Sequence, residues 1–185
     1  EGAMAWDDTI EYDGNDGFNG FASPDAWNPV QDLTDYLSLL FNLDDRVGYV
    51  TGDVWQDGEG KWLPSKGVYD RTAGELIASL KKHPDDIGAT VGDWKPEAGG
   101  WIRFNPLDGE GVKNENVTKF KYALVESDTL PIAEQDVLFR KLELPIAALV
   151  HSGGKSLHAI VRVDAADYEE YRKRVEFLYD FMEKQ

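Results

Sequence analysis

The chain has 185 residues, 42% of them hydrophobic, which is enough for one domain with a buried core. It has no cysteine, which excludes disulfides and thiolate zinc sites. Its 35 acidic residues outnumber its 19 basic ones, which argues against an extensive basic surface for nucleic acid. The sequence contains neither an apolar run of about 18 residues nor a signal-peptide pattern, so we expect a soluble cytoplasmic protein without a membrane partner.

The N-terminal segment differs in composition from the rest of the chain. Residues 1–4 read as a cloning remnant and are left out of the fold reasoning, and residues 1–30 as a whole are expected to form an acidic, glycine-rich arm with interspersed aromatic rings. Because disordered segments are poor in aromatic residues, we expect this arm to lie extended on the surface, anchored by its rings. The domain itself is expected over residues 31–185.

Turn and capping signals divide the first hundred residues into short elements. Thr72 and Glu75 form a capping box ahead of a helical pattern, and Asp57-Gly58 lies between two tryptophan-bearing runs, as in a hairpin. The expected elements are a helix over 30–41, a strand over 47–50, a hairpin over 53–63, a helix over 73–82 and a strand over 101–106.

The second half alternates strands with helices. The expected elements are a strand over 120–126, a helix over 132–142, a strand over 146–151, a turn over 152–155, a strand over 157–163 and a helix over 166–182. The last helix carries a continuous apolar stripe, and Asp164 is placed to cap it. This alternation predicts an α/β or α+β fold, with a mixed sheet and flanking helices.

Two polar motifs occur where packing alone would place apolar residues. Glu126 and Asp128 end one strand, and Ser156 and His158 begin another. Residues two apart in a strand share a face, so each pair projects together. Two carboxylates, together with a hydroxyl and an imidazole, can hold a divalent cation and the phosphates bound to it.

The segments RFNPLDG, NVTKFKYALVESD and ALVHSGGKSLHAIVRVD together resemble the catalytic core of the archaeo-eukaryotic primase superfamily, in particular primase-polymerases of phages and plasmids. That family has an acidic motif of the form D/E-x-D/E at a strand end and an S-x-H motif on a following strand. The resemblance covers residues 101–164 by motif and the first hundred residues only by the order of elements. It implies an N-terminal αβ unit over 31–100 and an RRM-like catalytic half over 101–185.

The resemblance implies a role for each matching residue. Glu126 and Asp128 bind Mg²⁺ or Mn²⁺ and act in catalysis together with His158. The resemblance implies that Ser156 and His158 contact the incoming nucleotide. Their position in the sequence suggests further contacts from Gly153, Gly154 and Lys155 in the adjacent turn. Arg103 and Asn105 are also candidates, because they end the strand expected beside the acidic one. The two motifs otherwise match the family in order, type and the glycine turn before the histidine.

The implied reaction is template-directed attack of a 3′-hydroxyl on a nucleoside triphosphate, which makes or extends primers in phage or plasmid DNA replication inside a bacterial host cell. The implied partners are nucleoside triphosphates, a single-stranded DNA template and a helicase in the same parent polypeptide. The family's third acidic residue follows the helix after the S-x-H strand, but here that helix runs to Gln185. Asp164 and Asp167 look like helix caps, so we expect a C-terminally truncated module that is weakly active or inactive.

Other interpretations remain open. The acidic pair could be a solvated strand end, the glycine turn a plain hairpin, and His158 a core histidine. A non-catalytic nucleotide- or protein-binding module of a replication protein fits the net charge of -16, and metal-dependent phosphodiester hydrolysis fits the carboxylates but leaves Ser156 and His158 without a task. A P-loop is rejected, because Leu149 stands where that motif needs glycine and a strand follows instead of a helix.

Overall fold

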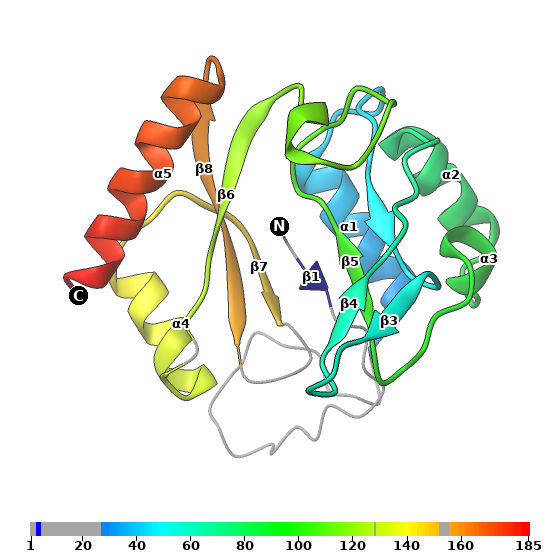
Figure 1. Ribbon diagram of the computed structural model, residues 1–185, viewed down its shortest axis with the longest axis horizontal. Helices are drawn as coiled ribbons and strands as arrows, with labels where there is room; N and C mark the ends of the chain where they lie inside the picture. The colour runs from blue at the N-terminus through cyan, green and yellow to red at the C-terminus, as the bar shows by residue number, and fades with distance from the viewer. Residues whose placement is uncertain (1–2, 5–26, 128, 152–155) are drawn as a thin grey trace.

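The computed structural model describes residues 3–4, 27–127, 129–151 and 156–185. Figure 1 shows two halves side by side, an N-terminal half built around α1 and α2 and a C-terminal half built on the strands β6, β7 and β8. The helices are α1 (Pro29–Leu40), α2 (Ala73–Lys82), α3 (Gly88–Val91), α4 (Ile132–Lys141) and α5 (Tyr168–Glu183), with a 3₁₀ turn at Asn114–Asn116. The strands are β1 (Ala3–Met4), β2 (Tyr49–Val50), β3 (Val54–Gln56), β4 (Trp62–Pro64), β5 (Gly100–Ile102), β6 (Phe120–Val125), β7 (Ile146–His151) and β8 (Leu157–Ala165).

The two long N-terminal helices begin where the capping signals lie. Asn28 accepts a hydrogen bond from the backbone N–H of Gln31 at the start of α1. At the start of α2, the Thr72 side chain accepts from the Glu75 N–H and the Glu75 carboxylate accepts from the Thr72 N–H. Both predicted helices are therefore confirmed to within one residue.

The N-terminal strands form two small sheets. The hairpin predicted around Asp57-Gly58 is confirmed, since β3 pairs with β4 and Trp55 lies opposite Leu63. The other sheet has the order β1-β5-β2. Ala3 pairs with Trp101 in it, so the described pair Ala3–Met4, which was left out of the sequence-based account of the fold, forms an edge strand of this sheet.

The C-terminal sheet has the order β6-β8-β7 and is antiparallel throughout its described strands. One face packs against α4 and α5 through residues such as Ala159, Phe139 and Leu178. The other face contributes Tyr122 and Ile160 to the core of the N-terminal half. Glu126 and His158 lie on this second face, so the halves meet near these two residues.

The start of α5 corrects one prediction. Asp167, not Asp164, is the N-cap residue, and its carboxylate accepts from the Glu170 N–H at 2.8 Å. Asp164 instead lies within β8 with φ of 40°, a left-handed backbone conformation that few non-glycine residues adopt.

The α+β class is confirmed, with small antiparallel sheets covered by helices. Among the described helices, none combines the length and the apolar character needed to cross a lipid bilayer.

Candidate functional site

The register of the C-terminal sheet brings the two polar motifs together. Val125 of β6 lies opposite Ala159 of β8, so Glu126, the next residue, reaches His158, the preceding one. Glu126 Oε2 lies 2.8 Å from His158 Nε2. Residues that are 32 positions apart in the sequence thus form a direct ion-pair or hydrogen-bond contact across the two strands.

The two partners differ sharply in their exposure. The His158 side chain is 8% exposed, whereas that of Glu126 is 44% exposed. With Nε2 directed at Glu126, the other ring nitrogen, Nδ1, is buried and has no hydrogen-bond partner among the described residues. A buried imidazole nitrogen without a partner is uncommon and costs stability, because burial removes the water to which it would otherwise bond.

A fully buried glutamine fixes the backbone around this pair. The side chain of Gln135, on α4, accepts from the Leu157 N–H at 2.8 Å and donates to the Leu130 carbonyl at 2.6 Å. It therefore ties the first residue of β8 to the segment that follows Glu126. Sequence reasoning missed Gln135, because a glutamine on an amphipathic helix looks the same whether it faces solvent or a buried backbone.

The remaining residues of the predicted site are described only in part. Ser156 is buried directly before β8, two residues from His158, and its predicted place on the same face as His158 stays a prediction. Asp128, Gly153, Gly154 and Lys155 lie outside the described residues. Their predicted contacts to metal and nucleotide stay predictions.

Arg103 and Asn105 lie elsewhere. The strand expected to pair beside β6 ends at Ile102 and belongs to the N-terminal sheet, so the expectation of a shared sheet is wrong. Asn105 is buried and its side chain bonds to the backbone of β6, accepting from the Lys121 and Tyr122 N–H groups and donating to the Tyr122 carbonyl. Tyr122 is four residues from Glu126, about 13 Å along an extended strand. Asn105 therefore closes the edge of β6 rather than joining Glu126 and His158.

Two tyrosines of α5 close the rest of that edge. The Tyr171 hydroxyl donates to the Tyr122 carbonyl at 2.8 Å, and the Tyr179 hydroxyl donates to the Leu124 carbonyl at 3.0 Å. Burial, and then the charge of Glu126, raise the pKa of Tyr179. The last helix thus reaches the surroundings of Glu126 through Tyr179, a connection that the sequence pattern did not indicate.

A second histidine adds to the electrostatics. Burial, and then the neighbouring His158, lower the pKa of His151 at the end of β7. Both effects favour the neutral ring.

The donor set suits a hard cation only in part. Glu126 supplies one carboxylate of the kind that Mg²⁺ and Mn²⁺ prefer. Within the described ranges, no group of three or more histidine or acidic side chains could hold a metal ion. Asp128, the second expected ligand, lies outside those ranges, so the described residues provide half of the predicted pair.

Comparison with protein-family models, curated proteins and solved structures finds no match to this chain.

Proposed function

We propose that this chain is the core of a nucleotidyltransferase of the primase-polymerase type, which transfers a nucleotide from a nucleoside triphosphate to a 3′-hydroxyl along a single-stranded DNA template. The observation that supports this proposal is the contact between Glu126 and His158, 2.8 Å apart. It joins one member of the acidic motif to one member of the S-x-H motif at the same end of the sheet.

The acidic motif holds the cation in this proposal. Glu126 is half exposed and can present carboxylate oxygen to an ion, with Asp128 as its partner. A divalent ion bound there supplies activation of the attacking hydroxyl and neutralises the leaving pyrophosphate. The net charge of -16 makes this neutralisation important, because the protein otherwise repels a polyphosphate.

His158 binds the triphosphate. Its burial and the neighbouring strands fix the ring, and its Nε2 faces the exposed carboxylate of Glu126. With a nucleotide bound, a phosphate oxygen would take the position of the carboxylate at Nε2, and Glu126 would be one of the residues that hold the cation. Ser156, which is buried two residues before His158, would add a hydroxyl donor to the phosphate. The Glu126 contact in the free protein thus holds His158 in readiness for an anion.

The test is calorimetric titration of a nucleoside triphosphate with Mn²⁺ into the wild-type chain and into single variants. Glu126→Ala and His158→Ala are each expected to weaken binding at least tenfold, because each removes one side of the phosphate and cation site. Removal of Mn²⁺ with EDTA is expected to abolish the binding in all of them.

Two variants serve as matched controls. Glu110→Ala removes an exposed acid from a loop of the N-terminal half, and His83→Ala removes a histidine at the end of α2. Both should bind like wild type. If wild type shows no heat of binding while circular dichroism shows that it is folded, the proposal is wrong. The result would then favour the alternative interpretation, a non-catalytic interaction module.

A further inference from the structure

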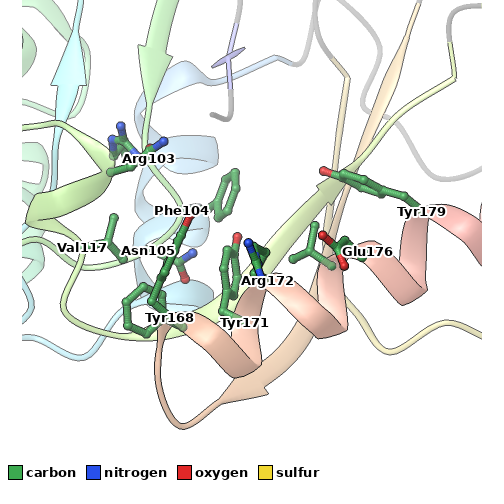
Figure 2. A pocket seen from close by; sticks show the side chains of 12 residues that line it. Arg103, Phe104, Asn105, Val117, Tyr168, Tyr171, Arg172, Glu176 and Tyr179 are labelled. Carbon is green, nitrogen blue, oxygen red and sulfur yellow. The ribbon is translucent and has the colours of Figure 1, made fainter.

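A cavity of about 330 Å³ lies outside the site described above. It is bounded on one side by the segment that follows β5 and on the other by α5, and Phe120 of β6 contributes to its lining. Figure 2 shows Arg103 and Asn105 on the first side, and Tyr171, Arg172 and Tyr179 on the helix. Its volume is at the lower end of the range for small-molecule sites, which run from about 300 to 1,000 Å³.

Aromatic rings form one wall of this cavity. The ring of Phe120 lies 6.0 Å from that of Tyr168 and 5.5 Å from that of Tyr171, measured between centroids. Tyr168 is 59% exposed although it packs on Phe120, so one side of this aromatic cluster stays accessible. The Tyr171 hydroxyl is already bonded to the Tyr122 carbonyl, which holds its ring in place. Fixed, partly exposed rings are the surfaces on which nucleic-acid bases stack.

Two arginines give the cavity a positive charge in an otherwise acidic protein. Arg103 donates to the Asn114 side chain at 3.1 Å and lies close enough to Tyr171 to oppose the rise in pKa, to about 12, that burial causes. Arg172 is exposed and makes no hydrogen bond or ion pair with any residue that the structure describes. Glu176, one turn further along α5, is the acidic side chain among the lining residues. Guanidinium groups on facing walls suit a phosphate between them.

We propose that this cavity binds one nucleotide unit of a single-stranded nucleic acid, with the base against Phe120 and Tyr168 and the phosphate between Arg103 and Arg172. The choice of a nucleotide over other aromatic anions rests on the proposed function. Tyr179 lines the same cavity and bonds to the carbonyl of Leu124, two residues before Glu126. A strand seated in the cavity therefore continues along the edge of β6 towards the candidate catalytic pair.

The test is fluorescence anisotropy of a labelled oligothymidylate at low ionic strength with EDTA, which removes the contribution of any metal-dependent site. Tyr168→Ala is expected to weaken binding about 5- to 150-fold, the range for loss of one stacking ring. Arg172→Ala is expected to weaken binding and to reduce the slope of log K against log salt by about 0.7, the value for one phosphate contact with a single strand. Glu176→Gln is expected to strengthen binding, because it removes a repulsive charge.

Lys173→Ala is the matched control, since it removes the same charge from the next residue of the same helix, where Lys173 pairs with Glu169 rather than lining the cavity. It should leave both affinity and salt slope unchanged. The proposal is overturned if Arg172→Ala and Tyr168→Ala bind like wild type, or if Lys173→Ala weakens binding as much as Arg172→Ala.

Free thymidine monophosphate, added as a competitor, separates the two possible sources of the nucleotide. If an unlabelled oligonucleotide of the same length competes far better per nucleotide than the monophosphate does, the ligand is a strand. If the two compete equally per nucleotide, and the Arg172→Ala variant no longer shows this competition, the cavity binds free nucleotides. Because the anisotropy assay contains EDTA, it reports on the cavity without the metal-dependent site, which the calorimetric titration with Mn²⁺ measures separately. The cavity and the metal-dependent site can therefore fail independently of each other.

Discussion

Buried polar side chains are treated differently in the two halves of the molecule. In the N-terminal half, Asp45 accepts hydrogen bonds from Lys119 and from the Asn42 backbone, and Thr51 donates to the Val91 carbonyl. Asn105 uses both ends of its amide on the backbone of β6. The C-terminal half contains the two buried side-chain atoms that lack a partner among the described residues, Asp136 Oδ1 and His158 Nδ1.

This difference distinguishes polar side chains whose hydrogen bonds hold the fold together from polar side chains that could bind a ligand. Asp136 has a local explanation, because its other oxygen pairs with Arg140 one turn along α4, at 2.7 Å. His158 has no such partner within β8, and among the described residues its ion-pair or hydrogen-bond partner is the partly exposed carboxylate of Glu126. Native proteins satisfy nearly all buried polar groups, so the unpaired Nδ1 leaves the ring held by packing and by the Glu126 contact at Nε2, the nitrogen that the proposal assigns to the nucleotide. The comparison predicts that structural groups affect stability when removed, whereas His158 affects binding.

The largest expected effect is on Asn105. Asn105→Ala leaves two backbone N–H groups and one carbonyl of β6 without the amide that serves them. We expect a loss of about 2 to 4 kcal/mol in the free energy of unfolding, because unpaired buried groups cost about 1 to 3 kcal/mol each and water can reach some of them. Urea unfolding followed by circular dichroism measures it.

Asn114→Ala is the matched control, since Asn114 is exposed and bonds to the Arg103 side chain. We expect a change within about 0.5 kcal/mol, as for most surface substitutions. If the two variants lose equal stability, the distinction between structural and surface amides in this half fails.

The smallest expected effect is on the pH dependence of stability. Burial and His158 lower the pKa of His151, so the unfolded chain binds a proton more readily than the folded one. The resulting stability is complete above the ordinary histidine pKa of about 6.5 and is lost as the pH falls below it. Urea unfolding at about pH 7.5 and pH 5.5 should show lower stability at the acidic pH in wild type.

His151→Gln should reduce this acid sensitivity, whereas His83→Gln, in the N-terminal half, should leave it unchanged. If all three proteins lose equal stability between about pH 7.5 and pH 5.5, other groups cause the acid sensitivity and His151 does not contribute to it.

Local signals in the sequence were sufficient to predict most of the secondary structure. The capping box of Thr72 and Glu75 marked the start of α2, and the strand over 146–151 agrees residue for residue with β7. The positions of Glu126 at the end of one strand and of His158 at the start of another were also predicted. These features depend on neighbours in the chain or on strand periodicity, which sequence patterns record directly.

The features that the sequence did not reveal depend on long-range packing. Arg103 and Asn105 were expected in a strand beside β6, but that strand joins the other sheet and only the Asn105 side chain reaches β6. Gln135 and Tyr179 take part in the site through hydrogen bonds to backbone groups of distant strands. Neither residue type nor periodicity distinguishes such a side chain from a solvent-facing one on an amphipathic helix.

The most direct test of the central claim measures the unfolding free energy of His158→Leu with and without a nucleoside triphosphate and Mn²⁺. The account predicts that the variant without ligand is within about 1 kcal/mol of wild type or more stable, because leucine removes an unpaired buried nitrogen. Ligand at about one hundred times the wild-type Kd is expected to stabilise wild type by about 2.7 kcal/mol and the variant by no more than about 1.4 kcal/mol, the value for tenfold weaker binding. A variant that loses several kcal/mol and is still stabilised by the ligand would show that His158 serves the fold rather than the nucleotide.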